Sequence, residues 1–177
     1  MNLRKIDSVL EGHPTPRSEF VDVATGSLGQ GLSNAVGMAF ASRLDGVRNR
    51  IYVLMGDGET AEGAVWEAAA IASHYHLNNL VAIVDCNRLG QSEATMYGHD
   101  LESYARKFEA FGWDVQVIDG HRIGEIAEAL NRAVEDGPRP HAIIARTLKG
   151  KGVSFMEDAN GWHGKPVTDE QMLEQAL

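Results

Sequence analysis

Cysteine is nearly missing from this 177-residue chain: Cys86 stands alone, which excludes an intrachain disulfide and fits a reducing compartment. No apolar run approaches the roughly 20 residues that a membrane span needs, and the first residues lack the apolar stretch of a signal peptide. Positive charge is in deficit, because 16 Lys+Arg against 25 Asp+Glu give a formal net charge of -9. We therefore expect a cytoplasmic protein whose main partners are neither nucleic acid nor membrane.

Four short apolar runs alternate with segments of helical period. The runs cover residues 51–55, 80–84, 115–118 and 142–145, and three of them lack strict alternation, which is typical of strands buried on both faces of a parallel sheet. Helical periodicity covers residues 32–40, 62–75, 101–111, 123–134 and 167–177. This order predicts a single α/β domain over residues 1–177, with a doubly wound, mostly parallel sheet and helices on both faces.

Acidic and amide side chains follow the first two predicted strands. Gly56-Asp57-Gly58-Glu59 follows the first strand and precedes a helix, whose free N–H groups suit a phosphate. Asn87 follows the second strand, and neighbouring strand ends should bring it beside Asp57. Carboxylate, amide and backbone carbonyl oxygens are ligands that Mg²⁺ prefers, so we predict a metal–diphosphate site. Arg88 and Gln91 flank this loop and either bind ligand or hold the loop.

The stretch from Gly56 to Ser92, GDGETAEGAVWEAAAIASHYHLNNLVAIVDCNRLGQS, resembles the thiamine-diphosphate motif of transketolases, particularly of the animal type and its bacterial relatives. Flanking motifs agree in type and order along nearly the whole chain: GHP (12–14), ATGSLGQGL (24–32), AFGWDVQVIDGH (110–121), TLKGKG (147–152) and WHGKP (162–166). The resemblance implies a thiamine-diphosphate-binding fold of the diphosphate-binding (PP) type.

The resemblance also implies roles for individual residues. The metal would be Mg²⁺, with Ca²⁺ or Mn²⁺ as substitutes, bound by Asp57, Asn87 and the carbonyl of Leu89. His13 matches a histidine that handles substrate hydroxyl protons, and Glu62 matches a glutamate that links two cofactors across a dimer interface. From the residues alone, the favoured interpretation of Glu62 is an acid stabilised by the dipole at a helix N-terminus. The expected cofactor-binding residues are Gly26, Ser27, Leu28, Gly58, Glu59, Asn87, Lys149 and His163.

Transketolases transfer a two-carbon ketol unit between a ketose phosphate and an aldose phosphate, and this is the activity that the resemblance implies. We expect a single diphosphate-binding domain without the family's first N-terminal stretch and without its pyrimidine-binding and C-terminal domains. A partner chain or second copy is then expected to supply the pyrimidine-binding domain in a homo- or hetero-oligomer. Two alternatives remain open. One is a subunit of another thiamine-diphosphate synthase or 2-oxoacid decarboxylase or dehydrogenase, and the other is a non-catalytic cofactor-binding module.

Overall fold

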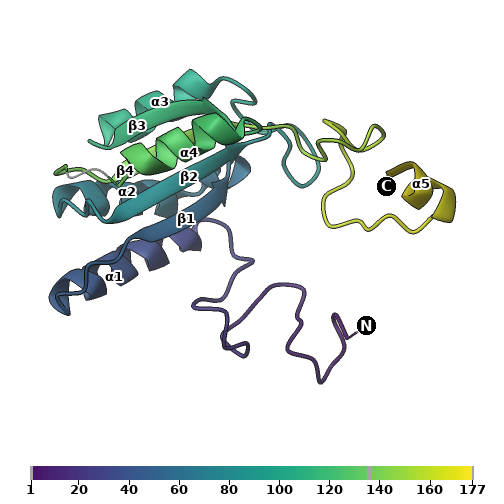
Figure 1. The fold of residues 1–177 in the computed structure, drawn as a ribbon, viewed down its shortest axis with the longest axis horizontal. Coiled ribbons are helices and arrows are strands. Elements are labelled where there is room, and N and C mark those ends of the chain that lie inside the picture. The colour runs from purple at the N-terminus through teal and green to yellow at the C-terminus, as the bar shows by residue number, and fades with distance from the viewer. Residues whose placement is uncertain (1, 135–136, 177) are drawn as a thin grey trace.

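A computed structural model describes residues 2–134 and 137–176, which form one parallel sheet with flanking helices (Figure 1). The strands are β1 (Ile51–Gly56), β2 (Leu80–Cys86), β3 (Asp114–Asp119) and β4 (His141–Arg146). Their order across the sheet is β1-β2-β4-β3, and every neighbouring pair is parallel. The helices are α1 (Gln30–Leu44), the 3₁₀ turn η1 (Gly58–Ala61), α2 (Gly63–His74), α3 (Leu101–Ala110), α4 (Ile123–Arg132) and α5 (Glu170–Ala176).

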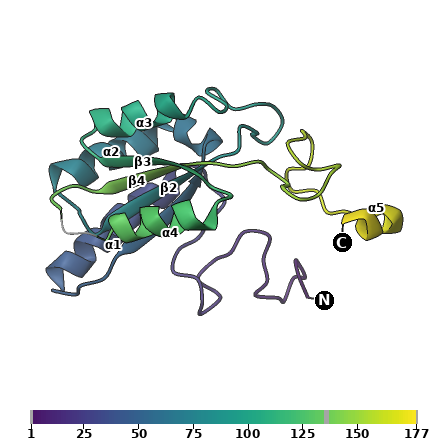
Figure 2. The same cartoon turned by 45° about the horizontal axis from the view of Figure 1, so that its top comes forward.

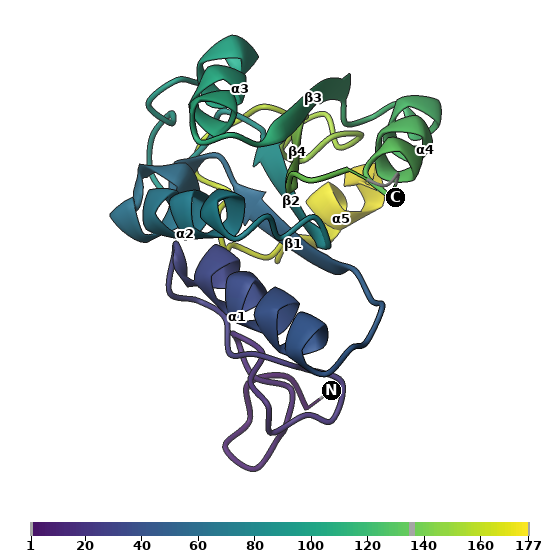
Figure 3. The same cartoon turned by 90° about the vertical axis from the view of Figure 1, so that its left-hand side faces the viewer.

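The helices cover the two faces of the sheet unequally (Figures 2 and 3). Buried side chains of α1, α2 and α3 form one large core with alternate residues of β1, β2 and β4. Each of these helices contributes a residue with 0% exposure: Leu32 from α1, Val65 from α2 and Phe108 from α3. On the other face only α4 packs on the sheet within the described residues, through a smaller cluster that includes Ala129 and Ile143. The predicted doubly wound α/β architecture is confirmed.

The positions of the helices and strands agree with those predicted from the sequence to within a few residues. The burial of the first strand differs from the prediction. We predicted that residues 51–55 would be buried on both faces. In the structure β1 alternates, and the side chains of Tyr52 and Leu54 are 48% and 72% exposed. The physical reason is position: β1 is an edge strand of the described sheet, and α4 lies over β2, β4 and β3 rather than over β1. The prediction was wrong for this strand.

The carboxyl ends of the four strands define the functional edge of the domain. The N-terminal segment before α1 and the segment after β4 both extend from this edge, at the right of Figure 1. Loops that follow β1 and β2 meet there, because the two strands pair in register from Ile51–Leu80 to Gly56–Asp85. Among the described residues, no helix has the length and apolar character needed to cross a membrane.

Candidate functional site

Asp57 lies at the end of β1 and faces the loop that follows β2. The residue is 3% exposed, and its carboxylate accepts hydrogen bonds from the backbone N–H of Arg88 (2.8 Å), the Thr95 hydroxyl (2.9 Å) and the backbone N–H of Gly58 (2.8 Å). Its own backbone N–H donates to the Asp85 carbonyl at 3.2 Å. The predicted juxtaposition of Asp57 with the loop that carries Asn87 is therefore confirmed.

The environment of Asp57 suits a carboxylate that accompanies a cation. Burial raises the pKa of this carboxyl, and the nearby Asp85 adds a smaller upward shift, whereas the Thr95, Arg88 and Gly58 hydrogen bonds oppose it. An ionised Asp57 would therefore be stabilised by a positive charge beside it. Its Oδ1 accepts one hydrogen bond, from Gly58, and a carboxylate oxygen has a second lone pair that remains for a metal.

Asn87 is oriented by its neighbours in the loop after β2. Its Nδ2 donates to Asp85 Oδ2 at 3.0 Å, and since a carboxylate only accepts, this contact fixes which end of the amide faces Asp85. The Asn87 Oδ1 then accepts from the backbone N–H of Leu89 at 3.1 Å. Within the described residues no hydrogen bond ends on the Leu89 carbonyl oxygen. This geometry is compatible with the predicted roles of Asn87 and Leu89 as oxygen donors.

The donor set at this edge is mixed rather than purely acidic. In the described part of the chain no cluster of three or more His, Cys, Asp or Glu side chains could hold a metal. One carboxylate, one amide oxygen and one backbone carbonyl leave coordination positions that Mg²⁺ fills with water and with phosphate oxygens. The residues present thus fit a metal that binds together with a phosphorylated ligand.

The loop before α1 brings two predicted site residues into contact. Gly26 has a φ of 107°, and a Cβ placed on it would lie 2.8 Å from Cγ of His13. The imidazole of His13 therefore lies against the glycine backbone, and only glycine fits both the conformation and the space. Ser27 and Leu28 follow on the surface, with Leu28 48% exposed. His13, Gly26, Ser27 and Leu28 thus form one exposed stretch beside the start of α1.

Glu59 joins this loop to the end of β1. Its Oε1 accepts from the backbone N–H of Gly29 at 2.9 Å, and its Oε2 accepts from the backbone N–H of Gly56 at 3.3 Å. Gly58, predicted to line a diphosphate, already donates its backbone N–H to Asp57. The carboxylate of Glu59 is therefore engaged by the protein itself, and a direct role toward a diphosphate stays a prediction.

Glu62 immediately precedes α2 and is exposed. It makes no side-chain capping hydrogen bond to the helix, but its place at the helix N-terminus still fits an acid stabilised by the helix dipole. Its Cβ lies against Gly29: a Cβ built on Gly29, which has a φ of 83°, would come within 2.7 Å of it. Glu62 thus has a Cβ packed against Gly29 and is itself exposed, as a residue at a dimer interface would be. The predicted role at that interface remains a prediction.

Lys149 and His163 come together on the segment that follows β4. The Lys149 Nζ lies 3.2 Å from the His163 Nδ1 and donates to the Gly90 carbonyl at 3.4 Å. Gly90 directly follows Leu89, so the second contact places the lysine beside the loop after β2. A cationic side chain at this position suits a phosphate ligand, as predicted.

Sequence reasoning missed several residues that hold the site in shape. The Thr95 hydroxyl binds Asp57, and the Thr147 hydroxyl donates to Asp85 Oδ1. His99 and His121, for which we had no role, contact the segment after β4: His99 Nε2 lies 2.9 Å from the Thr147 carbonyl, and His121 Nε2 accepts from the backbone N–H of Leu148 at 2.8 Å. His121 and Thr147 do lie within two of the motifs that carry the resemblance, whereas Thr95 and His99 lie between motifs and had no such signal.

The fold and the site together define a class of protein. Parallel α/β domains bind their ligands at the carboxyl edge of the sheet, and here that edge carries hard oxygen donors, glycine-rich turns and a lysine. This is the arrangement of a domain for a phosphorylated cofactor.

Comparison with known proteins names the family. The family model described as "Transketolase, thiamine diphosphate binding domain" matches residues 1–176. Transketolase from Homo sapiens is 51% identical over 178 residues, covering 100% of this chain and 28% of that protein. The crystal structure of transketolase from Campylobacter jejuni superposes with a TM-score of 0.90 and 35% identity, over 99% of this chain and 28% of that one. A transketolase from Pichia stipitis in complex with sedoheptulose-7-phosphate gives a TM-score of 0.84 and 28% identity, over 99% of this chain and 27% of that one.

The chain belongs to the transketolase thiamine diphosphate binding domain family. It spans little more than a quarter of the length of the relatives that it matches. The family and the fold that the resemblance implied are confirmed, whereas the predicted extent of the domain and the individual residue roles stay predictions.

Proposed function

We propose that this chain binds thiamine diphosphate together with Mg²⁺ and forms the diphosphate-binding part of an enzyme that transfers a two-carbon ketol unit from a ketose phosphate to an aldose phosphate. The observation that supports the cofactor site most directly is the contact between the Asp57 carboxylate and the backbone of Arg88, which lies between Asn87 and Leu89. The substrate class is supported by family membership and by the sugar phosphate in the complex of the Pichia stipitis relative.

The residues of this chain would divide the work of binding. Asp57, Asn87 and the Leu89 carbonyl would bind the metal, for which Ca²⁺ or Mn²⁺ could substitute, while Lys149 and His163 would offset the charge of the diphosphate. Thiamine diphosphate, when bound, supplies the nucleophilic carbon for cleaving the bond beside a ketose carbonyl.

His13 lies against Gly26 on the segment before α1, and the residue is exposed. We expect it to move protons on substrate hydroxyl groups rather than to hold the cofactor. His13→Ala should therefore lower turnover and leave the affinity for thiamine diphosphate unchanged. A large loss of cofactor affinity in this variant would contradict that assignment.

Two exposed surfaces of this chain suit contact with a pyrimidine-binding domain. The exposed Glu62 and the exposed loop at residues 26–28 are surfaces that a pyrimidine-binding domain would cover. We propose that a partner chain or a second copy supplies this domain, within a homo- or hetero-oligomer. We also propose a cytoplasmic location, which the single, buried Cys86 fits.

An assay of two donor classes tests the proposed activity. The chain, combined with a polypeptide that carries the pyrimidine-binding domain, should transfer two carbons from a ketose phosphate and not from a 2-oxoacid. The reverse preference would favour a decarboxylase or other synthase of the same cofactor class. Magnesium-dependent cofactor binding in calorimetry, with no turnover on either donor, would favour a non-catalytic module.

A further inference from the structure

Arg88 occupies an unusual position between two predicted metal ligands, Asn87 and Leu89. Its φ is 64°, a left-handed conformation that non-glycine residues adopt rarely and keep only where the surroundings impose it. In this conformation its backbone N–H donates to Asp57 at 2.8 Å and its carbonyl accepts from the Thr95 N–H at 2.9 Å. The backbone of Arg88 is therefore part of the wall around Asp57.

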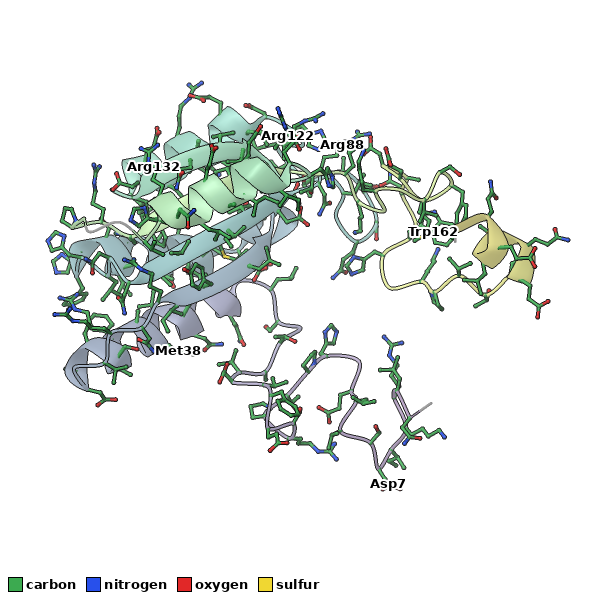
Figure 4. All side chains as sticks on the ribbon, viewed as in Figure 1. Asp7, Met38, Arg88, Arg122, Arg132 and Trp162 are labelled. Atoms are coloured by element: carbon green, nitrogen blue, oxygen red, sulfur yellow. The ribbon has the colours of Figure 1, made fainter. Side chains whose placement is uncertain are left out.

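The side chain of Arg88 points the other way, to the segment that follows β4, as its labelled position in Figure 4 shows. Its Nε donates to Asp158 Oδ1 at 2.7 Å and its Nη2 donates to Asp158 Oδ2 at 2.5 Å. This is a bidentate contact, the geometry that gives guanidinium–carboxylate pairs their directionality. Arg88 is thus fixed from two sides, by Asp57 through its backbone and by Asp158 through its side chain.

Asp158 is itself connected to the residues expected to hold the diphosphate. Its backbone N–H donates to the Lys149 carbonyl at 2.8 Å, and its φ of 55° is also left-handed. The turn between them is tight, because a Cβ on Gly150 would meet the Met156 carbonyl oxygen at 2.7 Å. A displacement of Asp158 would therefore move Lys149, and with it the contact to His163.

The other link between Lys149 and the loop after β2 is weak. It is the 3.4 Å hydrogen bond from Nζ to the Gly90 carbonyl, which comes from the same ammonium group that a phosphate would engage. The Arg88–Asp158 pair leaves that ammonium free, yet joins the same two segments. The ion pair can therefore hold these two segments together whether or not a ligand occupies the site.

We propose that the Arg88–Asp158 ion pair is a positioning device, which holds the segment bearing Lys149 and His163 against the loop bearing Asn87 and Leu89, so that the metal-binding and phosphate-binding groups face one ligand. This inference rests on the proposed function. Neither Arg88 nor Asp158 is assigned a contact with the ligand, and both act through their neighbours.

The test is a double-mutant cycle on thiamine diphosphate affinity, measured by calorimetry in Mg²⁺ with the full chain and a polypeptide that carries the pyrimidine-binding domain. Asp158→Asn keeps the size of the side chain and tolerates a positive φ, but loses the charge. We expect it to weaken binding about fivefold, as for the loss of a well-formed, partly exposed ion pair. In a Lys149→Met background the same substitution should have a clearly smaller effect, because only His163 is then left to be positioned.

Arg106→Gln is the matched control, because it removes an exposed ion pair to Glu102 on α3 and should leave cofactor affinity unchanged. Equal affinity of Asp158→Asn and the wild-type chain, or full additivity with Lys149→Met, would overturn the proposal.

Hydrogen exchange in the ligand-free chain separates this proposal from the proposed function. If the wild-type chain, combined with a polypeptide that carries the pyrimidine-binding domain, fails to bind thiamine diphosphate, the proposed function is wrong. Amide exchange over residues 149–163 then decides the role of the pair. Faster exchange there in Asp158→Asn, but not in Arg106→Gln, supports positioning by the pair. Unchanged exchange overturns it.

Discussion

Glu59 offers a prediction that separates two roles for one carboxylate. A glutamate that lined a diphosphate would repel it, so its removal would tighten cofactor binding. The structure instead shows Glu59 accepting from the backbone N–H groups of Gly29 (2.9 Å) and Gly56 (3.3 Å). We expect Glu59→Ala to destabilise the chain and to loosen the loop before α1.

The magnitude follows from these two contacts. A hydrogen bond to a charged group contributes roughly 1.5–3 kcal/mol, and the longer bond to Gly56 contributes less. Because Glu59 is only partly buried, we take the combined loss as about 2 kcal/mol. For a domain of this size that loss lowers the melting temperature by about 4–8 °C.

Glu59→Gln is the matched variant, because its amide oxygen can still accept from Gly29 while the charge is removed. Thermal unfolding followed by circular dichroism should show a drop for Glu59→Ala that is at least twice that for Glu59→Gln, and amide exchange at Gly29 should accelerate only in the alanine variant. Equal stability of wild type and Glu59→Ala, combined with tighter cofactor binding in either variant, would refute a role of Glu59 in stabilising the loop before α1.

Two further predictions concern a glycine and a buried histidine. Gly26→Ala should destabilise the loop by about 1–3 kcal/mol, because φ is 107° and the new Cβ would meet His13; adding His13→Ala should recover only the steric part, measured by urea unfolding. Burial lowers the pKa of His141 below 6.5, and its Nε2 has no partner among the described residues. The unfolded chain therefore takes up a proton that the folded chain resists, so stability should fall as the pH drops below about 6.5, and His141→Gln should flatten that fall in melting curves.

The elements of the fold were predictable because each follows from local periodicity. Residues 80–84 form a continuous apolar run and become part of β2, one of the two inner strands, in which five of seven residues are buried. The exposure of Leu54 was not predictable, because it depends on where α4 packs across the sheet rather than on the composition of β1.

The site residues that directly follow the strands were predictable from the sequence, whereas the loop residues that hold them in place were not. Asp57 and Asn87 stand out because polar residues directly follow apolar strands, so topology alone brings them close. Thr95 and Asp158 lie in irregular loops, and their contacts depend on left-handed turns and on chain paths that no period encodes. Sequence patterns specify which strands end beside one another, whereas the loops between them are set by tertiary contacts.

The central claim is that Asp57 and the loop after β2 bind a divalent cation that carries a diphosphate. Calorimetry of thiamine diphosphate with the chain and a polypeptide that carries the pyrimidine-binding domain, in Mg²⁺ and then in EDTA, tests this most directly. Asp57→Ala is compared with Asp114→Asn, which changes a carboxylate at the start of the edge strand β3. We predict binding that requires Mg²⁺, that is lost in Asp57→Ala, and that persists in Asp114→Asn. Equal affinity with and without Mg²⁺, or unchanged affinity in Asp57→Ala, would contradict the account.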